Sequence, residues 1–221
     1  MATETTRIVA GLTPETVQVM QLGPGLLLAN FEYQNIDRVA DFYMAFEAAI
    51  REGKSLGATR GGIETNITPE KRQREIDGAI ARFKGDSVID SWECYFTCDL
   101  LEFSPKVLQA VFPTAEFAES SPDAEGRKIT SMRIRTAIED DDYMQNICWI
   151  ATTDYGLIMF ALHNALGQTT GSISAESANE GTIPFRADGF ISSFDDIDYA
   201  PCEVWFIDRT GGISREVVAT P

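Results

Sequence analysis

The chain has 221 residues, of which 44% are hydrophobic and 24% charged. This composition is typical of a globular protein and excludes collagen-like, coiled-coil and wholly disordered chains. Its 34 acidic and 18 basic residues give a formal net charge of −16, which opposes tight binding to a nucleic-acid backbone. The longest apolar run, Leu157–Leu162, is far shorter than the roughly 20 residues that span a bilayer. The sequence therefore predicts a soluble protein without membrane insertion or a signal peptide.

The first third of the chain predicts two strands and a helix between them. Residues 25–31 follow a Gly-Pro-Gly turn signal and form a short apolar run that is typical of a buried strand. Apolar residues then recur at intervals of three and four over 37–50, which predicts an amphipathic helix with Asp37 as its N-cap. Alternation over 63–67 predicts a second strand, which we expect Pro69 to end.

The next segment contains the clearest strand of the sequence. Asp77-Gly78 is a strong hairpin-turn signal, and residues 88–100 alternate between apolar and polar side chains, as a half-buried strand does. Ser104 followed by Pro105 predicts the N-terminus of a two-turn helix. Residues 118–127 are rich in Ser, Pro, Asp and Gly and predict an exposed loop.

The remaining apolar runs predict a β-rich second half, with no linker that would divide the chain. We therefore expect one mainly β domain over residues 1–221, a β-sandwich or barrel-like fold with one or two short flanking helices. Residues 34–60 form a long excursion between early strands, and residues 209–221 form a C-terminal tail. The strands expected in this half are 129–134, 147–152, 157–165, 183–185, 190–194 and 204–207.

No motif in the sequence indicates catalysis, a metal or a cofactor. His163 is the single histidine, which excludes a His-rich zinc site, and no serine motif points to it as a triad partner, so we expect it to be structural. The acidic clusters 139–142 and 195–198 lack the spacing of a calcium loop and predict solvated turns. All cysteines fall in apolar, strand-like segments, which predicts reduced core residues. They are Cys94, Cys98, Cys148 and Cys202.

Three groups of short motifs between residues 24 and 208 carry a family resemblance through their order and spacing. The first comprises 56–63, 68–70 and 76–78; the second 84–85, 101–102, Pro105 and 107–108; the third Leu162, 164–166, Phe185, Asp188, Pro201 and 203–207. Together these segments resemble the major tail tube proteins of tailed bacteriophages.

The resemblance implies a non-enzymatic virion structural protein that closes into hexameric rings, which stack into the tail tube. The partners it implies are further copies of the chain, a tape measure protein, a tail terminator and baseplate or distal tail proteins. Genomic DNA would pass through without specific binding, and assembly would occur in the host bacterial cytoplasm. Six copies would carry six times the negative charge of one chain, and a channel lined by acidic groups would repel DNA phosphates. The alternative is that the negative charge serves only to keep the protein soluble.

The resemblance places contacts between rings in the long excursion from Gln34 to Arg60, and we expect the two termini to take part as well. The candidate contact residues are Phe42, Phe46, Ile50 and Arg60. In this interpretation, the apolar face of the 37–50 helix packs against a neighbouring subunit. The alternative is that the helix covers its own sheet.

Two other functions stay open on the sequence alone. One is a monomeric acidic β-sandwich that binds a carbohydrate or protein ligand through Trp149 or Trp205 on exposed strand faces. The other is a hydrolase with dispersed carboxylates and calcium at Asp195 and Asp196. The sequence does not distinguish a contractile from a non-contractile tail, or a phage from a phage-derived particle.

Overall fold

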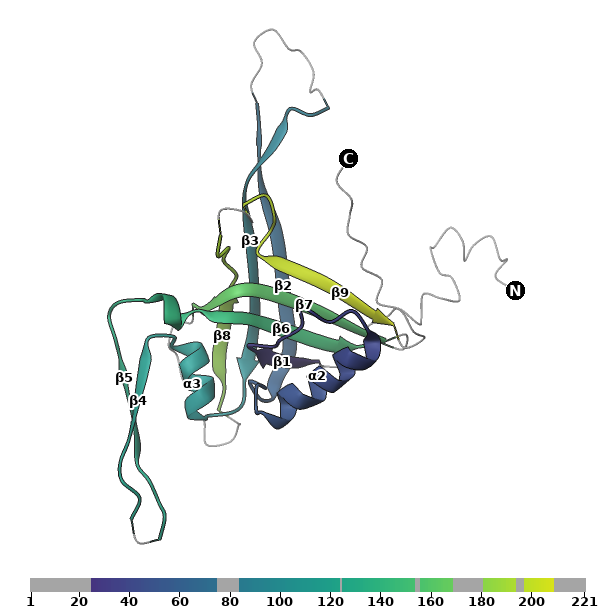
Figure 1. Ribbon diagram of the computed structural model, residues 1–221. Helices are drawn as coiled ribbons and strands as arrows, with labels where there is room; N and C mark the ends of the chain where they lie inside the picture. Colours follow the sequence, from purple (N-terminus) through teal and green to yellow (C-terminus); the bar gives the residue numbers. More distant parts are fainter. Residues whose placement is uncertain are drawn as a thin grey trace, which may run out of the picture.

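The computed structural model describes residues 25–74, 84–123, 125–153, 156–168, 181–193 and 197–208. Seven strands form one antiparallel sheet in the order β1-β6-β7-β8-β3-β2, with β9 paired to β7 (Figure 1). These strands are β1 (Leu26–Ala29), β2 (Thr59–Gln73), β3 (Ser87–Leu100), β6 (Met144–Thr152), β7 (Gly156–Gly167), β8 (Ile183–Asp188) and β9 (Cys202–Asp208). A separate hairpin contains β4 (Ala115–Glu119) and β5 (Thr130–Ile134). The mainly β fold class is thereby confirmed.

Two short helices flank the strands, α2 (Val39–Arg51) and α3 (Pro105–Val111), and a 3₁₀ turn covers Asp140–Asp142. The Ser104 hydroxyl accepts a hydrogen bond from the Val107 amide at 3.3 Å, which confirms the predicted cap. At α2 the residue before the helix is Arg38, without a side-chain cap, so the prediction of Asp37 as N-cap is wrong. In the described part of the chain, no helix combines the length and apolarity needed to cross a membrane.

The sheet bends sharply within β7. One edge of β7 pairs with β9 from Gly156 to Leu162 and then with β8 at Leu166 and Gly167. Asn164 lies between these two stretches with φ +43°, a left-handed conformation that asparagine adopts more readily than most residues. The bend divides the sheet into a β1-β6-β7-β9 half and a β2-β3-β8 half.

The two halves pack against each other as a sandwich. Gly167 lies directly against α3, because a Cβ there would stand 2.3 Å from the Ala110 carbonyl oxygen. Helix α3 therefore closes one end of the core. The core between the halves includes Leu27, Phe96, Leu100, Val107, Val111, Ile147, Trp149, Leu162, Ile183 and Phe185.

A second core lies under α2, on the other face of the β1-β6-β7-β9 half. Phe42 of α2 is fully buried and meets Phe31 edge to face at 5.7 Å between ring centroids. The buried Asn146 side chain fixes the segment after β1, since it accepts a hydrogen bond from the Phe31 amide and donates one to the Phe31 carbonyl, both at 2.8 Å. Tyr33 packs edge to face on Trp205 of β9. Helix α2 therefore covers its own sheet.

Three predicted boundaries are wrong. Strand β2 continues through Pro69, which pairs with Trp92; proline is tolerated because β2 is an edge strand and does not need every amide. Residues 115–119, partly within the predicted loop, form strand β4. Residues 190–193 form no strand. The predicted turn at 77–78 and the tail 209–221 lie outside the described residues.

Candidate functional site

The outer face of the β2-β3-β8 half is polar and acidic. Alternate residues of β3, such as Phe96 and Leu100, point into the core, so their neighbours point outward. Strand register places five carboxylates and two guanidinium groups on this face, a net charge of −3. We call it the acidic face. Its residues are Arg60, Glu64, Asn66, Thr68, Glu70, Ser91, Glu93, Tyr95, Thr97, Asp99, Pro184, Arg186 and Asp188.

One of the two cations on the acidic face is held by carboxylates. Arg186 Nε donates to Asp188 Oδ1 at 2.7 Å, and its Nη2 lies 3.2 Å from Glu93 Oε1. The guanidinium carbon stands 3.8 Å from the centroid of the Tyr95 ring. The hydrogen bond to Asp188 is the main reason why the pKa of Arg186 is raised. Its positive charge is therefore largely compensated at the surface.

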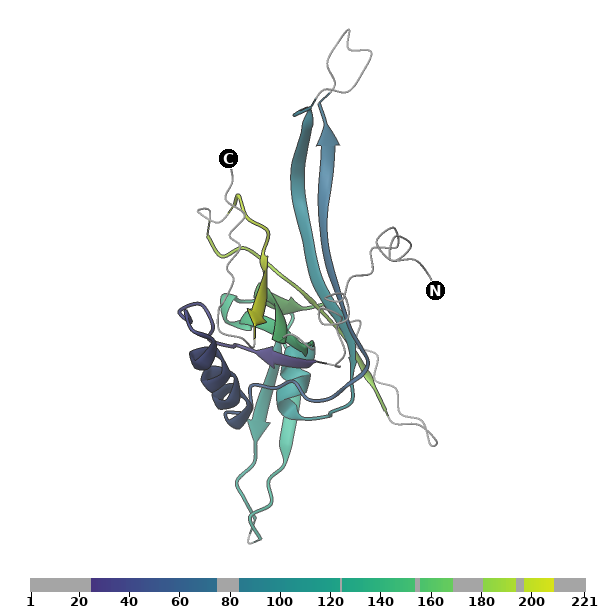
Figure 2. The ribbon, with the colours of Figure 1, turned by 90° about the vertical axis from the view of Figure 1, so that its right-hand side faces the viewer.

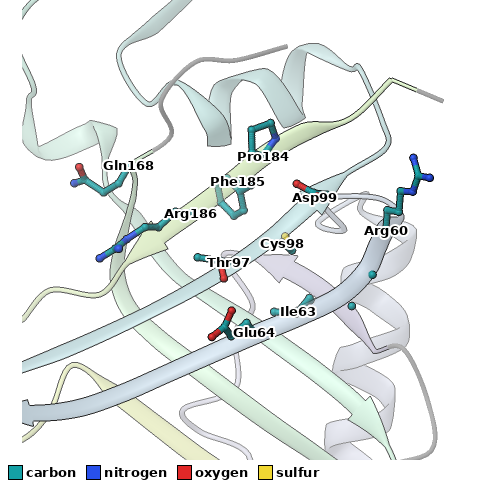
Figure 3. Close-up of a pocket in the computed structure, with 12 residues that line it drawn as sticks. Arg60, Ile63, Glu64, Thr97, Cys98, Asp99, Gln168, Pro184, Phe185 and Arg186 are labelled. Atoms are coloured by element: carbon teal, nitrogen blue, oxygen red, sulfur yellow. The ribbon is translucent and has the colours of Figure 1, made fainter. Parts of the chain in front are cut away.

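A hollow of about 510 Å³ lies on this face between Arg60 and Arg186, which occupy its two ends in Figure 3. The register shifts at its edge, where Gly61 and Gly62 have φ of +76° and +89°, values that favour glycine. Cys98 borders the hollow but lies on the core side of β3 with Phe96 and Leu100, and burial raises the pKa of its thiol to about 12. Among the described residues that line the hollow, there is therefore no activated cysteine nucleophile.

Strands β2 and β3 continue beyond the body as a two-stranded ribbon (Figure 1). The last β3 residue paired with β8 is Tyr95, whereas pairing between β2 and β3 extends to Gln73 and Ser87. We call this projecting part the long arm. Ile89 and Trp92 on it are 45% and 37% exposed. These two apolar side chains are thus open to solvent on a part of β3 with which β8 does not pair.

A groove runs along the base of the long arm. It has a volume of about 480 Å³ and lies between β3 and the segment that connects β8 to β9. Apolar side chains from both segments are exposed along it. We call it the arm groove, and its exposed apolar residues are Ile89, Trp92, Phe190, Ile191, Ile197 and Tyr199.

The β4–β5 hairpin projects in the opposite direction, as both views show (Figure 2). We call it the short arm. Arg135 fixes its base, since its guanidinium group forms ion pairs with Glu116, Glu139 and Asp142. The acidic turn predicted at 139–142 is largely exposed. Part of its negative charge is neutralised by Arg135. Ile134 on the short arm is 55% exposed.

The structure separates the four predicted contact residues. Phe42 has no exposed surface, so the prediction that it meets a neighbouring subunit is wrong. Phe46 packs at the edge of the same internal core. Ile50 is 44% exposed at the end of α2, and Arg60 lies on the acidic face. These residues do not form one surface.

The tryptophans of the alternative binding function are also placed differently from expectation. Trp149 is 7% exposed and Trp205 8%, so neither offers a ligand-binding face as predicted. Trp92 is the more exposed tryptophan. Strand alternation puts Trp92 on the core side with Cys94 and Phe96, but β8 ends before it can cover this position. Trp92 is exposed because β8 ends before it. The sequence of β3 alone does not indicate this exposure.

Of the residues considered for chemistry, the structure places His163 beside one carboxylate. His163 Nε2 lies 3.7 Å from Glu203 Oε1, and Asp195 and Asp196 lie outside the described residues. Within the described ranges, no cluster of three or more His, Cys, Asp or Glu residues is arranged to hold a metal. Comparison with protein-family models and with curated protein sequences finds no match for the chain.

Proposed function

We propose that the protein is a structural subunit of a phage-type tail tube, which assembles as six-membered rings that stack into a hollow tube. The observation that carries the proposal is the pairing of an acidic sheet face with a long edge strand on the same half of the sandwich. The order of the sequence motifs described above adds support.

Ring closure would use the edge of β2. This strand has 15 residues and, within the described part of the chain, pairs on one side only, with β3. A long open edge promotes uncontrolled association unless another strand pairs with it. Pairing of the edge with the next copy, repeated around a ring, forms a closed barrel without edges.

The acidic face would line the channel of such a ring. When β2 pairs with the next copy, the β2-β3-β8 sheets become continuous, and one of their two faces turns inward. The other face of this sheet is committed to the core of the subunit. Side chains such as Glu64 and Asp99 would therefore face the lumen, where they repel DNA phosphates.

The two arms suit stacking of successive rings. They project from opposite ends of the body (Figures 1 and 2), so the long arm of one ring would reach the next ring on one side and the short arm the next ring on the other. The arm groove would receive part of this contact. Apolar side chains exposed at these places would then become buried.

The test is electron microscopy of the purified full chain in negative stain, after concentration and prolonged incubation. We expect hollow rods or stacked rings with a central channel. Analytical ultracentrifugation of the same sample should show a species of about six copies or larger. A monomer at all concentrations, without rods or rings in negative stain, would contradict the proposal.

The role of the acidic face leads to a separate prediction. The double substitution Glu64→Lys with Asp99→Lys should leave tubes intact but cause them to retain DNA, because the channel surface becomes attractive to phosphate. Co-sedimentation of tubes with linear double-stranded DNA at low salt measures this retention, which should fall steeply as salt increases.

The matched control changes the same number of charges on α2, away from the acidic face. Asp41→Lys with Glu47→Lys alters two exposed carboxylates, and we expect these tubes to retain less DNA than the channel variant at equal salt. Equal retention by both variants would show that total charge, and not the acidic face, governs the effect.

A further inference from the structure

Two of the four cysteines lie in direct contact. The Sγ atoms of Cys94, on β3, and Cys202, the first residue of β9, are 3.3 Å apart. Both are free thiols. They are 108 positions apart in the sequence, so only the tertiary fold brings them together.

Backbone hydrogen bonds hold the two segments in place. The Gly189 amide donates to the Cys94 carbonyl at 2.9 Å, and the His163 amide donates to the Pro201 carbonyl at 3.0 Å. A Cβ on Gly189 would stand 2.8 Å from that same Pro201 oxygen. Gly189 therefore allows β3 and the start of β9 to approach, and the sulfur contact follows from the backbone.

The surroundings distinguish this pair from the other cysteines. Cys202 is partly exposed and borders a surface cavity of about 640 Å³, through which a small oxidant can enter. The hydrogen bond between the two sulfurs lowers the pKa of the Cys94 thiol and raises that of the Cys202 thiol. Burial instead raises the pKa of Cys98 to about 12 and that of Cys148 above its usual range. Among the four thiols, Cys94 is therefore the one most readily ionised, and Cys202 stands beside it as its protonated partner.

We propose that Cys94 and Cys202 form an oxidation site that closes to a disulfide when the protein meets a peroxide. The first thiolate attacks one oxygen of hydrogen peroxide, so that the O–O bond breaks and a sulfenic acid and hydroxide form. The second sulfur then attacks the sulfenic sulfur. Its thiol proton leaves with the sulfenic oxygen as water, and hydroxide takes up the proton lost by the first thiol. Two thiols and one peroxide thereby give one disulfide and two waters.

The cross-link would join the base of the long arm to β9. Cys94 lies next to Tyr95, where the long arm leaves the sandwich, and Cys202 opens the strand that completes the core under α2. A bridge across so long a loop raises resistance to unfolding. It needs a single chain only, so its test does not depend on ring assembly.

The experiment treats the reduced, folded full chain with hydrogen peroxide, alkylates it with iodoacetamide in denaturant, and maps the digested peptides by mass spectrometry. We expect one linked peptide pair containing Cys94 and Cys202, with Cys98 and Cys148 alkylated. The melting temperature of the oxidised chain should rise by about 5–15 °C and return after reduction.

Single variants separate the pair from general oxidation. Cys202→Ser should lose the linked peptide and the shift in melting temperature, and peroxide should leave a sulfenic acid at Cys94 that dimedone traps. Cys98→Ser is the matched control and should keep both effects. Four alkylated thiols in the treated wild-type chain, or a bridge between any other pair, would overturn the proposal.

Discussion

The double substitution Ile89→Asp with Trp92→Asp is expected to abolish tube growth and leave a folded subunit. Both side chains are exposed on the long arm, where they contribute little to the internal cores. Within a stacked tube they would be buried, and two carboxylates there would lose hydration without gaining partners. We expect electron microscopy to show at most isolated rings, while circular dichroism stays like that of the wild type.

A matched control uses Met44→Asp with Ile50→Asp. These residues are also exposed, at 63% and 44%, but they lie on α2, away from both arms. This variant should form tubes of normal length. If the α2 variant stops growth and the long-arm variant does not, the contact between rings lies in the 34–60 excursion and the role given to the long arm is wrong.

Phe42→Asp should prevent stable folding of the subunit. Phe42 has no exposed surface and packs on Phe31 and Tyr43. Truncation of a buried phenylalanine to alanine costs about 3–5 kcal/mol, and a buried carboxylate without a partner costs more. The free energy of unfolding of an ordinary domain is only about 5–15 kcal/mol. The aspartate variant should therefore be largely unfolded without urea.

Urea unfolding followed by circular dichroism and tryptophan fluorescence measures this effect. Phe42→Leu keeps most of the apolar volume and should remain folded with a lower midpoint, which controls for any change at this position. A Phe42→Asp chain with the wild-type midpoint would mean that α2 does not cover its own sheet.

Regular local patterns explain which elements the sequence predicts correctly. The alternation of apolar and polar residues correctly predicts β3, and the apolar runs predict β6 and β7. Ser104 followed by Pro105 predicts the start of α3. These signals depend on neighbours in the sequence. Strand β4 escapes prediction because its five residues have a single buried side chain, Ala115, and its pairing with β5 lies beyond a loop rich in turn residues.

Features of the site depend on distant contacts and are correspondingly harder to predict. The spacing of Phe42 and Phe46 correctly predicts an amphipathic helix, but amphipathicity does not say which surface covers the apolar face. The sulfur contact of Cys94 needs the bend of β7 and the position of β9. The exposure of Trp92 depends on where β8 ends.

The core under α2 joins the two ends of the described chain and thereby sets an order of events during synthesis. It contains Leu28 and Phe31 from the beginning of the chain, and Trp205 and Ile207 from near its end. A domain completes its folding only when the residues that make its long-range contacts have been synthesised. The core under α2 therefore cannot form fully before β9 has left the ribosome. In the tube assembly proposed above, a chain would therefore join a ring only after β9 has been synthesised.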